Sequence, residues 1–360
     1  MVVGLSQHSR GLVNLIGELE TRMIGSSPGP PLDAETSALI PEGRTYVLVV
    51  FDGLGVAQLG HHAAGPLLRS HRATLQAPFP TTTSVSLATI ATGIPPSQHG
   101  LVSHLAWLEE VGRVVNTLKW IDLSGQPVAH DYSSVLPALN LWERLRRAGI
   151  EPVTVQPHPF TGSPLSRLLY RGARFEGTSG EHDMVDATVQ LASVPNRLVL
   201  AYVWQVDFAG HVSGLASDEF SAAVLLAADV WEGLAARLPP EVTLIGTADH
   251  GLIEYGEKDK ILVRGEPFES LRFAGDPRGV HLWGESRVFD ELEALTGGEL
   301  TDPLGLLGPD PSAETKRRVG DVLLMAPDGK VILPPGFDKR LRCYHGGLAR
   351  HEVEIPLLVA

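Results

Sequence analysis

YVLVVFDGLG, residues 46–55, is a continuous run of apolar and β-branched residues that ends in an aspartate and two glycines. A run of this kind without alternation predicts a strand buried on both faces, as in a parallel sheet. Asp52 would then stand at the carboxyl end of the strand, where the glycines let the backbone approach a ligand closely. The stretch lacks the G-x-G-x-x-G order of a dinucleotide-binding loop. We therefore interpret Asp52 as a ligand-binding carboxylate.

Similar apolar runs recur along the chain and alternate with segments of helical periodicity. We expect strands at 153–155, 198–206 and 242–247. Helices are expected at 5–24, 84–92, 139–148 and 217–238, and the helix at 84–92 should start near Thr83. Strands that alternate with helices predict an α/β fold with a doubly wound, mostly parallel sheet flanked by helices.

The regular alternation ends after Gly251. Short strands are expected at 260–263, 279–283 and 322–325, a helix at 287–295, and an edge strand at 355–359. We interpret residues 252–339 as a smaller inserted α+β subdomain. Residues 1–251 together with 340–360 would form the metal-binding α/β catalytic domain.

Composition limits the class of protein and its partners. The 360 residues are 43% hydrophobic, enough for a substantial core, and the formal net charge of −13 disfavours binding to nucleic acid polymers. The single cysteine, Cys343, excludes an intramolecular disulfide framework and fits a reducing compartment. We expect no signal peptide and no membrane span, because charges interrupt the N-terminal stretch and no apolar run is long enough. We predict a cytoplasmic protein without a membrane partner.

Four further polar clusters follow strand-like runs. They are Thr83 in PFPTTTSVS, Asp207 and His211 in VDFAGH, Asp249 and His250 in GTADHG, and His345 in CYHGG. In open α/β sheets, ligands bind outside the carboxyl ends of the strands, so these clusters and Asp52 predict one site. Carboxylates and imidazoles in two subsites are suited to two metal ions that assist phosphoryl transfer. As isolated patterns, the same residues are also typical of helix caps, turns and surface histidines.

The threonines 81–83 precede a predicted helix and allow two interpretations. A hydroxyl at a helix N-terminus is near free N–H groups, which favour an alkoxide nucleophile. Plain N-capping explains three threonines equally well, and composition alone favours it. The remaining histidines, among them His99 and His104, are interpreted as surface or core residues.

The ordered set of clusters resembles the alkaline phosphatase superfamily, and most closely its nucleotide pyrophosphatase/phosphodiesterase branch. The stretches TIATGIPPSQHGL (residues 89–101) and LWERLRRAG (residues 141–149) add to the resemblance. It covers residues 44–255 and 340–360. The individual motifs are short, and their combination in this order carries the specificity.

The resemblance implies a ligand set and a reaction. Asp207, His211 and His345 would hold one zinc ion, and Asp52, Asp249 and His250 the other, although different divalent metals would also fit. Thr83 would be the nucleophile that bridges toward the second zinc and forms a covalent phospho-enzyme, which water then hydrolyses. The substrate would be a small phosphate ester, with a nucleotide as one option, and the enzyme a hydrolase.

One position departs from the pattern expected for diesterases. In those diesterases, an Asn that donates to a phosphoryl oxygen is expected three residues after the nucleophile. This chain has Ser86 at that position. Ser86 is therefore a candidate catalytic residue, with Asn116 as an alternative donor. The leading hypothesis is a phosphodiester or pyrophosphate hydrolase. A phosphomonoesterase, a phosphonate hydrolase and a non-catalytic metal-stabilised binding protein remain alternatives. Residues 104–135 and 157–180 and the segment after 251 are expected to determine specificity.

Overall fold

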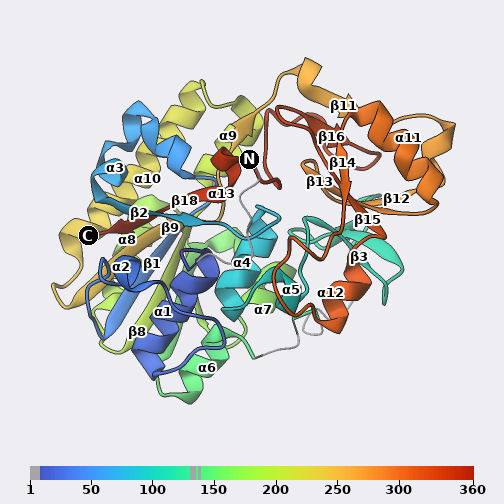
Figure 1. Ribbon diagram of the computed structural model, residues 1–360. Helices are drawn as coiled ribbons and strands as arrows, with labels where there is room; N and C mark the ends of the chain where they lie inside the picture. Colours follow the sequence, from blue (N-terminus) through green and yellow to red (C-terminus); the bar gives the residue numbers. More distant parts are fainter. Residues whose placement is uncertain (1–8, 130–134, 137–138) are drawn as a thin grey trace.

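A computed structural model describes residues 9–129, 135–136 and 139–360 and contains two seven-stranded sheets (Figure 1). The central sheet has, in spatial order, β2 (His71–Gln76), β18 (Glu354–Val359), β9 (Val242–Ala248), β1 (Thr45–Phe51), β8 (Arg197–Val203), β6 (Glu151–Pro157) and β7 (Arg174–Thr178). The strands from β9 to β7 pair in parallel, and β18 pairs antiparallel with both of its neighbours. The mostly parallel α/β sheet predicted from the sequence is confirmed.

Helices cover both faces of this sheet (Figure 1). Contacts between helices define one group of α1 (Leu12–Ile24), α4 (Thr83–Thr92), α6 (Leu141–Arg147) and α7 (Pro164–Leu169), and another of α3 (Gly65–Ser70), α8 (Glu181–Ala192), α9 (Gln205–Ser213) and α10 (Asp218–Arg237). Short helices α2 (Ala34–Ser37), α5 (Pro96–His99) and α13 (Arg350–Val353) complete this part. Every residue of β1, β8 and β9 is buried, as their unbroken apolar runs predicted.

Some predicted elements differ from the structure, two of them at the start and the end of the chain. The strand expected at 355–359 exists as β18, but it is not at the edge, because β2 pairs along its other side. β2 has the mixed sequence HRATLQ and a mixed burial pattern, so it lacks the apolar run that marks the inner strands. The helix expected at 5–24 begins at Leu12, and residues 5–8 lie outside the described part of the chain.

The second sheet is antiparallel and lies beside the central one (Figure 1). Its order is β14 (Glu299–Thr301), β15 (Val322–Met325), β13 (Gly279–Trp283), β12 (Arg272–Asp276), β3 (Leu105–Leu108), β4 (Arg113–Asn116) and β5 (Ile121–Asp122), accompanied by α11 (Ser286–Thr296) and α12 (Ala313–Arg318). Two small pairs add β10 (Ile253–Glu254) with β17 (Cys343–Tyr344), and β11 (Lys260–Leu262) with β16 (Val331–Leu333).

This sheet combines two distant parts of the chain. β12–β15 come from the segment 252–339 that we predicted as a subdomain, whereas β3–β5 come from the first 251 residues. The domain division therefore stays a proposal, to which the structure adds that 105–122 associate with the inserted segment. Among the described helices, none has the length and apolarity required to cross a bilayer.

Candidate active site

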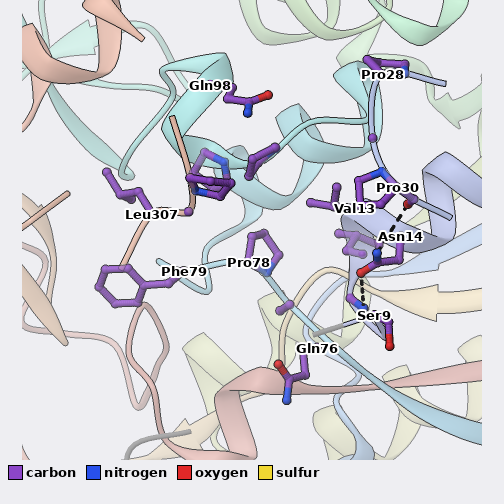
Figure 2. A pocket seen from close by; sticks show the side chains of 18 of the residues that line it. Ser9, Val13, Asn14, Pro28, Pro30, Gln76, Pro78, Phe79, Gln98 and Leu307 are labelled. Atoms are coloured by element: carbon purple, nitrogen blue, oxygen red, sulfur yellow. Dashed lines mark hydrogen bonds between the residues drawn. The ribbon is translucent and has the colours of Figure 1, made fainter. Parts of the chain in front are cut away.

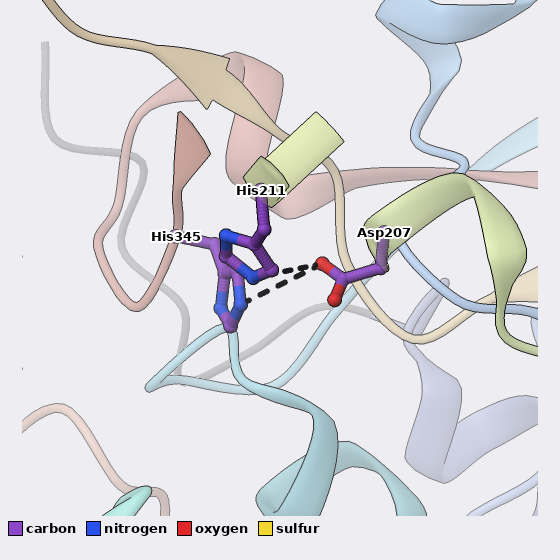
Figure 3. Close-up of side chains that lie close together, drawn as sticks. All are labelled: Asp207, His211 and His345. Atoms are coloured by element: carbon purple, nitrogen blue, oxygen red, sulfur yellow. Dashed lines mark ion pairs between the residues drawn. The ribbon is translucent and has the colours of Figure 1, made fainter. Parts of the chain in front are cut away.

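Asp207 and His211 (Figure 3) lie on α9, which starts just beyond the carboxyl end of β8. The sequence pattern predicted a strand through residue 206, but β8 ends at Val203 and the chain turns directly into a helix. Residues four apart lie on the same face of a helix, so the spacing brings the carboxylate and the imidazole together. His211 Nε2 is 3.2 Å from Asp207 Oδ1.

His345 completes this first group from the loop after β17. Its Nε2 is 3.8 Å from Asp207 Oδ1. Its Nδ1 donates to the main-chain oxygen of Thr81 at 2.8 Å, and His211 Nδ1 donates to that of Cys343 at 2.7 Å. Donation from Nδ1 to a carbonyl leaves the Nε2 lone pair available, which is the usual arrangement of a metal-binding histidine. Both Nε2 atoms face the same carboxylate (Figure 3).

The second group consists of Asp52, at the end of β1, with Asp249 and His250, at the end of β9. His250 Nε2 is 3.5 Å from Asp52 Oδ1 and 3.5 Å from Asp249 Oδ2. The main-chain N–H groups of Gly53 and His250 donate to Asp249 Oδ1 at 3.0 and 2.9 Å, which orients the carboxylate. The phenol of Tyr202, on β8, donates a short hydrogen bond to Asp52 Oδ2.

Gly53 is required where these two strands meet α9. Its φ is +73°, and a Cβ at this position would lie 2.9 Å from Cα and Cβ of Asp207. The glycine therefore allows the backbone after Asp52 to contact the backbone of the first group directly.

Thr83 is the first residue of α4, and its hydroxyl faces the second group. Oγ1 donates to Asp52 Oδ1 at 3.4 Å and lies 3.1 Å from His250 Nε2. The neighbouring threonines do not cap the helix with their side chains: Thr82 makes no cap hydrogen bond, and Thr81 Oγ1 donates to Gly347 O at 3.0 Å. The capping interpretation thus does not account for these threonines.

The two groups lie side by side. The imidazole rings of His250 and His345 are stacked, with their centroids 3.7 Å apart. In each group, one ligand atom from every residue lies within 4.8 Å of the others. The structure therefore brings together, in one place, all six side chains that the sequence pattern suggested as metal ligands.

Charge in this cluster is unbalanced without a cation. Burial, and then the carboxylates of Asp249 and Asp207, raise the pKa of Asp52 well above its usual value. For Asp207, burial opposes ionisation, but interaction with His211, His345 and His250 outweighs it and lowers the pKa. Burial, followed by His250, lowers the pKa of His345. Burial lowers the pKa of His211, but the Asp207 carboxylate outweighs it and raises that pKa. Metal binding requires ionised carboxylates and neutral imidazoles, so a divalent cation would offset the repulsion between the carboxylates.

Two carboxylate oxygens without hydrogen-bond partners indicate whether the residues fit a metal. Asp207 Oδ1 and Asp249 Oδ2, one from each group, are buried and accept no hydrogen bond. Buried charged oxygens without partners are costly unless an ion is bound. Three carboxylates and three imidazoles are a suitable donor set for divalent metals, zinc among them. The side chains present therefore fit metal binding in both groups.

Ser86, predicted as a candidate catalytic residue, is fully buried in α4. Its hydroxyl donates to the main-chain oxygen of Asp249 at 2.7 Å and so helps to fix the backbone of the second group. His104, which the sequence pattern did not single out, lies between the two segments that carry Thr83 and His345: its N–H donates to Asp276, which packs against Gly346, and its main-chain oxygen accepts from Thr117, which contacts Ser84. Asn116 contacts His104, with 3.1 Å between Asn116 Nδ2 and His104 Nε2. A lone histidine carries no sequence signal of such a position, because β3 and β4 reach the site only through the second sheet.

A separate pocket of about 410 Å³ lies between α1, α5 and the loop that contains Leu307 (Figure 2). Its lining is mostly apolar and rich in proline, and Asn14 donates to Pro30 O beside it at 3.4 Å. None of the predicted site residues lines it. It is thus distinct from the Asp/His cluster.

Solved structures resemble the chain in fold. Murine ectonucleotide pyrophosphatase/phosphodiesterase 5 is 18% identical with a TM-score of 0.67, over 87% of each chain. An inactive variant of that protein, solved in complex with AMP, aligns equally well. Phosphonoacetate hydrolase from Sinorhizobium meliloti 1021 in complex with phosphonoformate is 18% identical with a TM-score of 0.64, over 89% of this chain and 91% of that chain. No curated protein sequence matches significantly.

The family model for type I phosphodiesterase/nucleotide pyrophosphatase matches residues 46–272. The match spans more than half of the chain and includes five of the six candidate metal ligands together with Thr83. The protein therefore belongs to the type I phosphodiesterase/nucleotide pyrophosphatase family, in the alkaline phosphatase superfamily, and is a hydrolase.

Proposed function

We propose that the protein hydrolyses phosphodiester or pyrophosphate bonds of a small substrate with Thr83 as nucleophile and two zinc ions. Asp207, His211 and His345 would hold one ion, and Asp52, Asp249 and His250 the other. The observation that carries the proposal is the position of Thr83 Oγ1, 3.1 Å from His250 Nε2 and at the N-terminus of a ten-residue helix. When bound, the zinc ions would supply Lewis acidity that favours the alkoxide form of the threonine.

The chain's own residues then have separate roles. Thr83 Oγ1 attacks phosphorus; the Oγ1–P bond forms as the bond to the leaving-group oxygen breaks, the hydroxyl proton passes to solvent, and the leaving-group oxygen takes up a proton from solvent. Water then attacks phosphorus; a new P–O bond forms as the Oγ1–P bond breaks, and Oγ1 takes one of the protons of the water. Before attack, Asp52 Oδ1 accepts the hydroxyl proton in a hydrogen bond, and the first turn of α4 contributes a positive potential. Ser86 orients Asp249 through its main-chain oxygen, which makes it a positioning residue in this proposal.

The nucleophile is tested by exchanging Thr83. Thr83→Ala should abolish turnover of bis-p-nitrophenyl phosphate while the zinc content stays unchanged, and Thr83→Ser should keep part of the activity. Thr92→Ala is the matched control, because Thr92 lies at the other end of α4 and donates to Ala88 O. Activity of Thr83→Ala near the wild-type level would refute the assignment.

The metal ligands are tested by counting zinc. Elemental analysis of purified wild-type protein should give two zinc ions per chain, and Asp207→Ala should give about one. Asp338→Ala is the control, since Asp338 is a carboxylate near His211 that belongs to neither group. Two full zinc ions in Asp207→Ala would contradict the assignment.

Phosphonate hydrolysis is a second candidate, favoured by the similarity in fold to a protein solved in complex with phosphonoformate. The ratio of kcat/KM for bis-p-nitrophenyl phosphate to that for p-nitrophenyl phosphate separates diesterase from monoesterase activity. Release of phosphate from phosphonoacetate would instead identify a phosphonate hydrolase. We also propose a cytoplasmic location, supported by the single, buried Cys343.

A further inference from the structure

His104 is held beside the first group by contacts from two sides. Its main-chain N–H donates to Asp276 Oδ2 at 3.3 Å, and its main-chain oxygen accepts from the hydroxyl and the N–H of Thr117, each at 2.9 Å. The Thr117 hydroxyl is also 2.9 Å from Ser84 Oγ, one residue after Thr83. A Cβ on Gly346, one residue after His345, would lie 2.4 Å from Asp276 Cβ. These contacts fix the backbone of His104 relative to both Thr83 and His345.

Asn116 determines which imidazole nitrogen of His104 carries the proton. Asn116 Oδ1 accepts from the main-chain N–H groups of Leu118 and Lys119, both at 3.1 Å. The carboxamide NH₂ therefore faces His104 Nε2, 3.1 Å away, and donates to it. An Nε2 that accepts a hydrogen bond has no proton, so a neutral His104 is protonated on Nδ1.

The His104 imidazole is neutral, and its Nδ1 proton is accessible. Burial is the largest cause that lowers the pKa of His104, to about 4. Within the described part of the chain, Nδ1 has no hydrogen-bond partner, and it is not among the enclosed polar atoms without partners. The side chain is half-buried. A neutral donor beside two metal-binding groups does not add charge repulsion with the cations.

We propose that His104 is a substrate-binding residue whose Nδ1–H donates a hydrogen bond to a non-bridging oxygen of the phosphoryl group, and that Asn116 is the positioning residue that maintains this tautomer. The assignment rests on the proposed function, because it needs a phosphoryl group between Thr83 and the first group. His104 would thus provide the hydrogen-bond donor to the phosphoryl oxygen. Ser86 cannot provide it, because its hydroxyl donates to the main-chain oxygen of Asp249. The second sheet thereby contributes directly to the reaction.

Replacement of His104 by two amides gives a matched test. The Asn carboxamide nitrogen occupies the place of an imidazole Nδ1, whereas that of Gln occupies the place of Nε2. His104→Asn should therefore keep kcat/KM for bis-p-nitrophenyl phosphate within about tenfold, and His104→Gln and His104→Phe should lose about 10²-fold, the usual effect of removing one transition-state donor. His281→Gln is the control: His281 is another buried histidine of this sheet, and its Nδ1 accepts from Gly320 N at 3.2 Å.

A second test addresses Asn116 and does not depend on turnover. Asn116→Asp keeps the acceptor for the two main-chain N–H groups but presents oxygen to His104 Nε2. In ¹⁵N–¹H spectra of the zinc-loaded protein, wild-type His104 should be the Nδ1–H tautomer, and the variant should be protonated on Nε2. Loss of kcat/KM in Asn116→Asp should accompany loss of the Nδ1 proton. A wild-type His104 protonated on Nε2 would overturn the proposal, as would equal kcat/KM in His104→Asn and His104→Phe.

Failure of the proposed function is distinguishable from failure of this inference. If zinc-loaded wild-type protein hydrolyses no phosphate ester, the role of Thr83 fails, whatever the His104 variants do. Binding of inorganic phosphate, measured by calorimetry, then decides the role of His104. Weaker phosphate binding by His104→Phe than by His104→Asn supports a phosphoryl donor, and equal binding refutes it. Zinc content is measured for every variant, and a loss of zinc in His104→Phe would instead make His104 a support of the metal site.

Discussion

The orientation of the Asp52 carboxylate depends on a hydrogen bond from one phenol. Tyr202 donates to Asp52 Oδ2, while Asp52 Oδ1 faces Thr83 and His250. A hydrogen bond to one carboxylate oxygen orients the other toward a metal, and removal of such a partner commonly costs 10–100-fold in metal affinity. The orientation of Asp52 thus depends on a residue of the neighbouring strand β8, 150 positions away in the chain.

Tyr202→Phe is therefore expected to weaken zinc binding at the second group about 10- to 100-fold and to leave the first group intact. Competition with a chromophoric chelator measures the two affinities separately. Tyr170→Phe is the control, because it removes the hydroxyl of another buried tyrosine that donates to none of the six candidate ligands. Unchanged affinity in Tyr202→Phe would show that the contact has no part in metal binding.

Gly53 is a second single residue on which the site depends, because it allows the backbone after Asp52 to approach Asp207 closely. Gly53→Ala combines an unfavourable positive φ with a Cβ placed 2.9 Å from Asp207, so it should lower both stability and zinc content at the first group. Gly25→Ala separates the two effects, because Gly25 has a φ of +83° with open space around its Cβ position. It should cost only the backbone penalty, about 1–2 kcal/mol. Equal melting temperatures and zinc contents of the two variants would rule out the clash with Asp207.

At the scale of elements, a buried ion pair attaches α1 to α6. Arg144 donates to both carboxylate oxygens of Glu20, at 2.5 and 2.9 Å, and to the main-chain oxygen of Thr92 at the end of α4, at 2.9 Å. The Glu20 side chain is completely buried. Three helices on one face of the sheet therefore meet at this pair.

Glu20→Gln should destabilise the protein by roughly 3 kcal/mol, because it leaves the charge of the largely buried Arg144 without its partner. Urea denaturation followed by circular dichroism measures the change. Glu232→Gln breaks the exposed pair with Arg69 and should leave stability almost unchanged. A small effect in Glu20→Gln would mean that water or the carbonyl groups compensate Arg144.

At the scale of the whole molecule, Asp276 connects the second sheet to the loop that carries His345. It lies at the end of β12, accepts from His104 N, and is packed against Gly346. Burial raises the pKa of its carboxyl group to about 7. Because this value is above the usual one near 3.8, the unfolded chain releases this proton more readily than the folded protein. The group therefore costs no stability below about pH 4, and the cost grows as pH rises to 7 and is constant above it.

Asp276→Asn should remove this pH dependence while keeping an oxygen for His104 N. We expect the variant to match the wild type near pH 4 and to exceed it by a few kcal/mol above pH 7, since each pKa unit corresponds to about 1.4 kcal/mol. Melting temperatures from pH 4 to 8 measure the difference. Asp338→Asn provides the opposite case, because Arg340 lowers the pKa of Asp338 to about 2. A stability difference for Asp276→Asn that is independent of pH would contradict the assignment.

Local sequence predicted much of the central sheet. The strand expected at 242–247 is β9, Val242–Ala248, and the helix expected from Thr83 is α4, which begins there. These elements carry unbroken apolar runs or helical periodicity that depend on neighbouring residues alone. β2, β4 and β5 were missed because they are strands of mixed polarity, and β3 because its apolar run is only four residues long; such strands acquire their structure from pairing with distant partners.

The sequence by itself determined the α/β class and the positions of Asp52, Asp249 and His250, since these follow apolar strands whose ends are recognisable locally. Thr83 and His345 were identified only through the resemblance of the whole ordered set of clusters. Only the tertiary structure decided that His250 stacks on His345, that Ser86 bonds to the main chain, and that His104 reaches the site. The physical reason is that these contacts join segments separated by up to 163 residues. Their geometry is set by how two sheets and their helices pack, and no local pattern encodes it.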